Sequence, residues 1–136
     1  MNVEFIDTNL LVYAYNGDAG SRGVTAAELV KRLWRERSGR LSTQVLHEFF
    51  HTMTRKYRLP VVDARAIVGE LAEWDPVVIT TPMTLDAIDL SARWQTSFWD
   101  GLILAAARSA GATLLWTEDL AHGQRYGAVE VRSPFR

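Results

Sequence analysis

The sequence contains no cysteine, which excludes disulfide bonds, thiolate nucleophiles and zinc sites built on cysteine. It also lacks a long hydrophobic run, because the longest, LILAAA at residues 102–107, is far too short to cross a bilayer. The first residues, MNVEFIDTNLL, have no basic segment of the kind that opens a signal peptide. We therefore expect a cytoplasmic protein without a membrane-spanning segment.

An excess of charge of one sign is missing as well. The 15 basic and 16 acidic residues leave a net charge of −1, which argues against nucleic-acid binding through bulk positive charge alone. Any polyanion would need a local basic patch or a metal ion. Basic residues cluster at 31–40 and 55–58, where they form either a solvated helix face or a rim that contacts phosphates.

The remaining composition is that of one globular domain over residues 1–136, with 48% hydrophobic and 23% charged residues. Short β-rich runs alternate along the chain with segments of helical periodicity. This alternation predicts an α/β fold, in which a mainly parallel sheet carries helices on both faces. The predicted strands are 3–6, 40–43, 77–80, 113–117 and 128–131, and the predicted helices are 8–16, 23–37, 44–57, 62–74, 84–95 and 98–110. Residues 118–127 are predicted to form a turn.

Four acids stand beside these predicted strands so that topology assigns them to one edge of the sheet. Asp7 directly follows the first strand, and Asp119 follows the strand TLLWT. Glu48 lies in the opening turns of the helix after the second strand, and Asp100 opens the helix that runs back to TLLWT. Ligands of such sheets gather at the carboxyl ends of the strands. We therefore expect these four carboxylates to converge there.

Each acid also has a plain local explanation. Asp7 could cap the following helix, Ser97 and Asp100 have the spacing of a capping box, Asp119 could be a turn residue, and Glu48 could flank an apolar helix face. Convergence favours a functional site, because several carboxylates at close range repel each other unless protons or a cation neutralise them. Hard oxygen donors favour Mg²⁺ or Mn²⁺ over zinc.

The segment HEFFH, residues 47–51, matches the HExxH pattern of zinc proteases. A third ligand and the glycine-containing extension of that pattern are missing, and His47 and His51 lie opposite the apolar face of their helix. We expect both histidines to face solvent. On the preceding helix, by contrast, the apolar face includes Trp34, which we expect in the core.

Taken in order, four pieces resemble the PIN-domain ribonucleases, and within them the VapC-type toxins of bacterial toxin–antitoxin modules. They are FIDTNLLVYA, LSTQVLHEFFHTMTRK, SFWDGLILAAARSAGATLLWTEDLAHGQRYG and VRSPF, and together they cover nearly the whole chain. The resemblance implies a single PIN domain, a three-layer α/β/α sandwich around a mainly parallel sheet of four or five strands. It also implies a metal-dependent endoribonuclease that hydrolyses RNA phosphodiester bonds.

By the same resemblance, the catalytic acids would be Asp7, Glu48, Asp100 and Asp119. Asp7 and Asp100 would bind Mg²⁺ or Mn²⁺ directly, and Asp119 would be a further metal residue. Glu48 and Asp119 could also hold water on the ion, bind a second ion or accept the proton of the nucleophile. Polar support around the acids would come from Asn9 and Thr117.

The resemblance further implies partners: a homodimer, and a small antitoxin that covers a hydrophobic groove and the acidic pocket. Apolar surface for these contacts could come from Trp34, Trp94, Phe98 and Trp99. The candidate residues for binding RNA are Arg22, Arg35, Arg40 and Arg55. The extra acid Glu118 leaves these RNA contacts less well defined.

Other functions remain open from the sequence. A catalytically silent PIN-like module that binds RNA or protein would share the pattern but would lack a metal site that depends on the acids. FIDTN also resembles the start of haloacid-dehalogenase-like phosphatases, but Asn9 stands where that family has its second acid. A receiver domain would need paired acids near the first strand and a lysine at a strand end, and neither Lys31 nor Lys56 meets the second condition.

Overall fold

A five-stranded sheet forms the centre of the computed structural model, which describes residues 2–136. The strand order is β2-β1-β3-β5-β4, and all neighbouring strands are parallel except β4 and β5. This confirms the prediction of a mainly parallel sheet. The strands are β1 (Val3–Ile6), β2 (Gly39–Arg40), β3 (Ala112–Trp116), β4 (Arg125–Tyr126) and β5 (Val129–Arg132).

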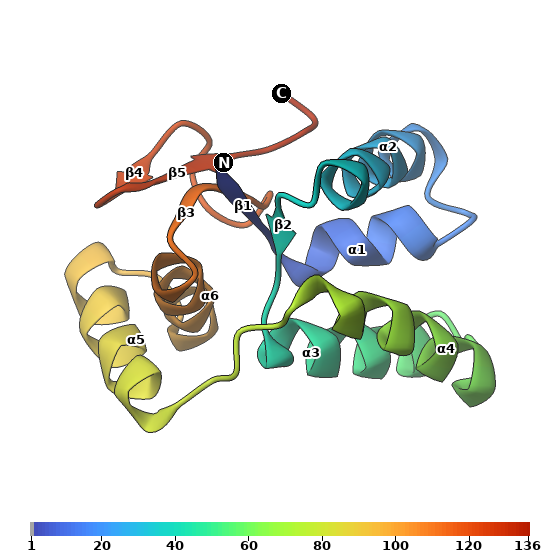
Figure 1. Ribbon diagram of the computed structural model, residues 1–136, viewed down its shortest axis with the longest axis horizontal. Helices are drawn as coiled ribbons and strands as arrows, with labels where there is room; N and C mark the ends of the chain where they lie inside the picture. Colours follow the sequence, from blue (N-terminus) through green and yellow to red (C-terminus); the bar gives the residue numbers. More distant parts are fainter. Residues whose placement is uncertain (1) are drawn as a thin grey trace.

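Helices cover both faces of this sheet, as Figure 1 shows. Helices α1 and α2 pack together on one side, and α5 and α6 pack together on the other; α3 packs on both α1 and α4. The arrangement is the expected three-layer α/β/α sandwich. The helices are α1 (Thr8–Tyr15), α2 (Gly20–Glu36), α3 (Thr43–Arg55), α4 (Val61–Leu71), the 3₁₀ helix η1 (Ala72–Trp74), α5 (Thr81–Trp94) and α6 (Phe98–Ser109).

Helix α6 is buried along most of its length, from Gly101 to Ala107, which explains its run of apolar residues. It packs against α5 on one side and against β3 and β5 on the other. A Cβ atom at Gly101 would lie 2.5 Å from the carbonyl oxygen of Ala87 in α5, so the two helices cross too closely for any larger residue. The position of α6, and with it that of Asp100, therefore depends on this glycine.

Two strand predictions differ from the structure. Residues 77–80 form no strand, because only Val77 pairs, in an isolated bridge with Ser42. The chain then leaves the sheet, and Val78 is exposed. The predicted strand 40–43 is shorter, because Ser42 instead caps α3 by accepting a hydrogen bond from the Val45 N–H. The predicted turn at 118–127 contains β4, which pairs with β5 across a tight turn at Gly127.

Trp34 was expected in the core, but its side chain is 39% exposed. Its indole stacks on the buried Trp74, with ring centroids 6.1 Å apart, and Arg37 lies over it at 4.1 Å. Trp34 is therefore at the edge of the apolar face of α2, where the helix meets η1. Within residues 2–136, we find no helix long and apolar enough to cross a membrane.

Candidate active site

The register of the central strands brings the ends of β1 and β3 side by side. Ile6 pairs with Trp116, so the next residues, Asp7 and Thr117, lie at the same level of the sheet. The Thr117 hydroxyl donates a hydrogen bond of 2.7 Å to Oδ2 of Asp7, and both side chains are buried. The other carboxylate oxygen, Oδ1, accepts 2.7 Å from the Thr8 N–H and so caps α1. Both oxygens of Asp7 are thereby held in place.

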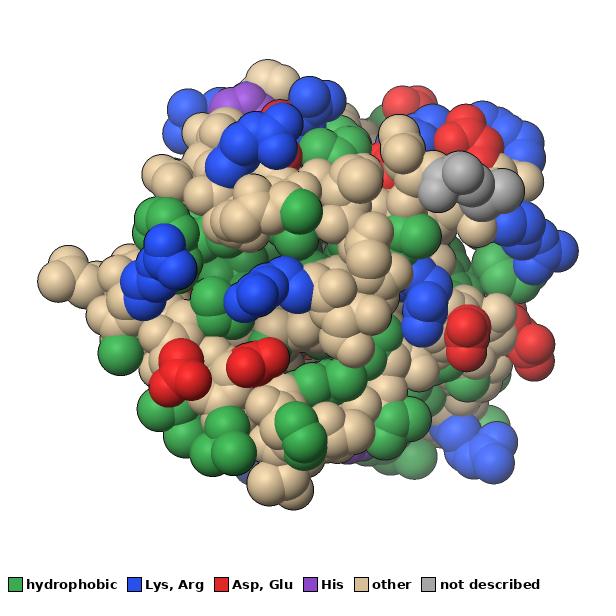
Figure 2. Space-filling view, turned by 60° about the vertical axis from the view of Figure 1, so that its left-hand side comes forward, with side chains coloured by type: hydrophobic (Ala, Val, Ile, Leu, Met, Phe, Trp, Pro, Cys, Tyr) green, Lys and Arg blue, Asp and Glu red, His purple; other side chains and the backbone are tan. Residues whose placement is uncertain are grey.

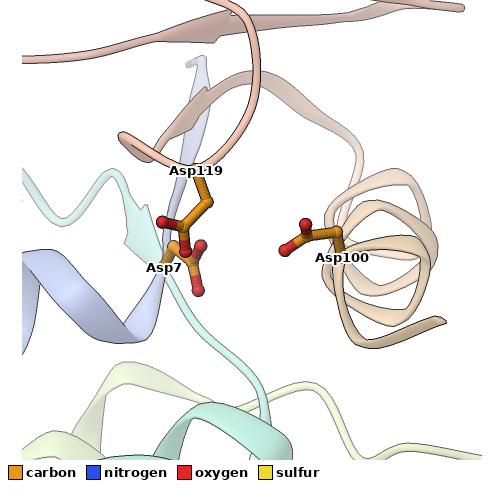
Figure 3. A group of neighbouring side chains, drawn as sticks. All are labelled: Asp7, Asp100 and Asp119. Carbon is orange, nitrogen blue, oxygen red and sulfur yellow. The ribbon is translucent and has the colours of Figure 1, made fainter. Parts of the chain in front are cut away.

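Asp100 and Asp119 approach Asp7 from two other elements. Asp100 lies in the first turn of α6, where Ser97 caps the helix by accepting a hydrogen bond from the Asp100 N–H. Asp119 lies in the loop after β3, and its N–H donates to the Thr117 hydroxyl at 3.1 Å. One carboxylate oxygen from each of the three aspartates lies within 4.8 Å of the others. Figure 3 shows the three side chains directed toward a common space.

Glu48 faces the same cavity from α3 but is not part of this close group. Its Oε1 accepts a hydrogen bond of 2.6 Å from the Thr8 hydroxyl, and its Oε2 accepts 3.2 Å from Nε2 of Gln44. Thr8 therefore links two of the predicted acids, since its N–H binds Asp7 and its hydroxyl binds Glu48. The carboxylate of Glu48 is oriented before any ligand arrives.

The electrostatics of the cluster favour protons or a cation. Burial, reinforced by the charges of Asp119 and Glu48, raises the pKa of the Asp7 carboxyl from 3.8 to about 7 against the opposing hydrogen bonds from Thr117 and Thr8. Burial likewise raises the pKa of Asp100 and of Asp119. Near neutral pH, Asp7 is therefore partly protonated unless a positive ion takes the place of the proton.

The two predicted polar supports both lie at this cluster. Thr117 bridges Asp7 and the backbone of Asp119, as described above. Asn9 lines the cavity, and its amide lowers the pKa of Asp119 against the effect of burial. No partner among residues 2–136 satisfies either polar atom of the Asn9 amide with normal hydrogen-bond geometry. A ligand at the acids would be an additional partner for this amide.

The chemistry of the donors fits a hard divalent cation. The groups that could bind a metal ion here are the oxygens of three carboxylates and of the Asn9 amide. Oxygen ligands are those that Mg²⁺ and Mn²⁺ prefer. Within the described chain, this is the one group of three or more potential metal ligands. Asp7, Asp100 and Asp119 are the residues that could hold the ion.

The cavity around the acids has a volume of about 520 Å³. His51 and Lys56, both exposed on or just beyond α3, contribute its basic lining. Tyr13 and Glu118 close another side, where the Tyr13 hydroxyl donates 2.6 Å to Glu118. Glu118 is also paired with Arg22 at 2.7 Å, so its charge is balanced.

The lining of this cavity, within residues 2–136, includes none of the four arginines that were predicted to bind RNA. Arg22 binds Glu118 at its rim, while Arg40 binds the backbone oxygen of Asp75. Arg35 and Arg55 are exposed on α2 and α3. Of the two histidines in HEFFH, both are exposed as predicted, and His51 borders the acidic cavity.

Sequence reasoning missed Thr8, Gln44 and Tyr13 as parts of this site. Thr8 directly follows Asp7, and Gln44 lies one helical turn before Glu48, so the spacing of i and i+4 was a usable signal for Gln44. The pairing of Tyr13 with Glu118 spans 105 residues and had no local signal.

Comparison with known proteins agrees with this fold. The structure is similar to Mycobacterium tuberculosis VapC20, described as a Sarcin-Ricin loop cleaving toxin, with a TM-score of 0.65 and 22% identity over 82% of this chain and 86% of that one. It is also similar to a chain of FitAB bound to an IR36 DNA fragment, with a TM-score of 0.73 and 16% identity over 98% and 96% of the two chains. The sequence comparison with curated proteins finds no match. The PIN domain family matches residues 5–127, which is most of the chain, and this protein therefore belongs to the PIN-domain family.

Proposed function

We propose that this protein is a metal-dependent endoribonuclease that acts in the cytoplasm as the toxin of a VapBC-type toxin–antitoxin module. The observation that carries the proposal is the meeting of Asp7, Asp100 and Asp119, with carboxylate oxygens within 4.8 Å of one another at the floor of an open cavity. Such a cluster is costly unless a cation completes it. Membership of the PIN-domain family and the likeness to an RNA-cleaving toxin support the same function.

The roles of the side chains follow from their contacts. Asp7, Asp100 and Asp119 would hold Mg²⁺ or Mn²⁺, which when bound lowers the pKa of water and neutralises charge on the phosphate. Glu48, oriented by Thr8 and Gln44, would accept the proton of the attacking water. His51 and Lys56 would contact phosphates at the rim.

Two protein contacts complete the proposal. An apolar cavity of about 290 Å³ lies between α1, α2, α4 and η1, lined by Tyr15, Val30, Trp34 and Trp74 among others. We propose it as the groove that receives the antitoxin, because it exposes the Trp34 indole, which stacks on the buried Trp74. For the homodimer, we propose the outer face of α5, where Leu85 and Ile88 are exposed. Figure 2 shows hydrophobic side chains along the lower part of the face seen from that side.

The test is cleavage of a structured RNA pool by purified protein in Mn²⁺ or Mg²⁺. We expect cleavage that is abolished by EDTA and by Asp7→Asn, and retained by Asp18→Asn, which changes an exposed acid outside the cavity. Circular dichroism would confirm that each variant is folded. Inert wild-type protein across both metals, with no Asp7-dependent binding of Mn²⁺, would establish the silent module instead. Equal activity of wild type and Asp7→Asn would mean that the activity belongs to a contaminant or to another site.

A further inference from the structure

Trp99 is exposed beside the acidic cluster, and none of the proposed catalytic roles involves its side chain. It immediately precedes Asp100, and its side chain is 60% exposed, more than that of any other tryptophan in the chain. A large apolar ring is normally buried, since its contact with water is unfavourable. An exposed indole next to a candidate active site therefore indicates a ligand that binds against it.

The indole stands between two cavities. It lines the acidic cavity, and it also lines a second one of about 470 Å³ bordered by His47, Ile79 and Leu102. Gln44 and Glu48 are likewise shared by the two cavities. A chain molecule that passes from one cavity into the other would cross the border formed by Trp99, Gln44 and Glu48, where the exposed indole offers the one aromatic surface.

Two contacts hold Trp99 in position, one from Phe98 and one from Gln44. The Phe98 ring meets the Trp99 ring edge to face, with centroids 5.1 Å apart at 74°, and Phe98 itself packs on the core. Nε2 of Gln44 donates to the Trp99 carbonyl oxygen at 3.4 Å as well as to Glu48 at 3.2 Å. Because both partners are acceptors, the amide must point its nitrogen toward them. One glutamine therefore ties the backbone of Trp99 to an acid of the candidate site, while the Phe98 ring contacts the indole itself.

Positive charge lies elsewhere on the acidic cavity, at Lys56. A nucleic-acid strand has both features that these groups would recognise: phosphates for the basic residues and the acids' cation, and flat bases for the indole. A base can stack on a side chain only when it is unpaired and turned out of its own helix.

Resting on the proposed ribonuclease function, we propose that Trp99 is a stacking platform for an unpaired base next to the phosphate that is cleaved. The enzyme then selects single-stranded or looped RNA over duplex RNA. Stacking of one base on an aromatic side chain corresponds to a loss of about tenfold or more when the ring is removed. In this role Trp99 determines specificity, while the acids determine whether any cleavage occurs.

The experiment uses an oligonucleotide that contains a site mapped from the cleaved RNA pool, either alone or annealed to its complement. In Mn²⁺, we expect Trp99→Ala to lower kcat/KM on the single strand about tenfold or more, and Trp99→Phe to retain most of it. Duplex cleavage should be slow for every variant. Val24→Ala removes a similarly exposed apolar side chain on α2 and should behave as wild type. Mn²⁺ affinity, measured by calorimetry, should be unchanged in Trp99→Phe and Trp99→Ala.

Three results would overturn the inference. The first is equal kcat/KM for wild type and Trp99→Ala on the single strand, and the second is equally fast cleavage of duplex by the wild type. The third is conversion of a dimer to a monomer in Trp99→Ala, seen by light scattering, with the preference for single strands intact, since that would assign the ring to a protein contact. Absence of metal-dependent cleavage in the wild type would instead refute the proposed function itself.

Discussion

At the scale of single residues, the Asp7 carboxylate has two structural partners and one predicted ligand. It caps α1 through Thr8 and binds the Thr117 hydroxyl, while facing Asp100 and Asp119. The cap explanation and the cluster explanation of this acid are therefore compatible, because the two oxygens serve different neighbours. The same holds for Asp100, whose N–H is capped by Ser97 while its carboxylate faces the cluster.

The buried charge of Asp7 predicts a pH-dependent stability of the metal-free protein. Its pKa is about 7 in the folded state and near 3.8 in an unfolded chain, so the folded protein binds the proton more tightly. Its contribution to stability is therefore full below pH 3.8 and is lost as the pH rises through 7. In EDTA at pH 8, we expect the free energy of unfolding of Asp7→Asn to exceed that of wild type by on the order of a few kcal/mol at most. The variant should therefore unfold at a higher temperature. The difference should shrink at pH 5.

Calorimetric melting at both pH values, with and without Mn²⁺, measures this effect. The asparagine can still accept from Thr8, and the Thr117 hydroxyl can rotate to accept from its amide. Mn²⁺ should stabilise the wild type and not the variant. A lower melting temperature for Asp7→Asn at pH 8 in EDTA would show that the Asp7 carboxylate is not destabilised by its surroundings.

Thr117 gives a second prediction at this scale. Its buried hydroxyl donates to Asp7 and accepts from the Asp119 N–H, so it orients two of the three aspartates. Thr117→Val keeps the shape but removes both bonds, and we expect Mn²⁺ affinity to fall about 10- to 100-fold. Thr117→Ser should retain most of the affinity. Isothermal titration with Mn²⁺ distinguishes them, and equal affinity in Thr117→Val would exclude the orienting role.

At the scale of elements, the site depends on how closely α6 approaches α5. Gly101 lies one residue after Asp100, and its Cα faces the backbone of Ala87 with no room for a methyl group. The apolar pattern of the sequence predicted that α6 is a helix. It did not predict which helix would cross it, because the partner of an apolar face depends on tertiary packing.

We therefore expect Gly101→Ala to destabilise the protein by about 1–3 kcal/mol, because α6 must move away from α5. The movement carries Asp100 with it, so Mn²⁺ affinity should also fall. Gly69→Ala is the matched control, since a Cβ atom there meets nothing within 4 Å on the exposed side of α4. It should be neutral or stabilise by about 0.4–1 kcal/mol. Urea unfolding of both variants tests the comparison, and equal stability would contradict the close crossing.

At the scale of the whole molecule, charge is distributed so that a nearly neutral protein has an acidic cavity with basic groups at its rim. The four arginines that the sequence suggested for RNA binding lie outside the cavity lining, and Lys56 and His51 lie within it. The basic clusters in the sequence indicated how much positive charge was present in each segment. They did not indicate which charge faces the acids, because neighbouring residues of a helix point in different directions.

This distribution predicts the salt dependence of RNA binding. Lys56→Gln should flatten the plot of log affinity against log salt by about one unit, as expected for the loss of one phosphate contact. Arg40→Gln should leave the slope unchanged, because Arg40 is engaged with the backbone oxygen of Asp75 outside the cavity. Fluorescence anisotropy with a labelled single-stranded RNA measures both slopes. A change in Arg40→Gln alone would place the RNA path across β2 instead.

The sequence by itself determined the class of fold, most helices and the edge of the sheet at which the acids lie, because apolar periodicity and the alternation of strands and helices are local properties that restrict topology. Tertiary structure alone decided that Thr8 and Gln44 hold Glu48, outside the close group of three aspartates. It also decided that Trp99 stands in solvent between two cavities while Gly101 lies against α5. These features depend on the pairing register of β1 with β3 and on the packing of distant helices, which no local pattern specifies.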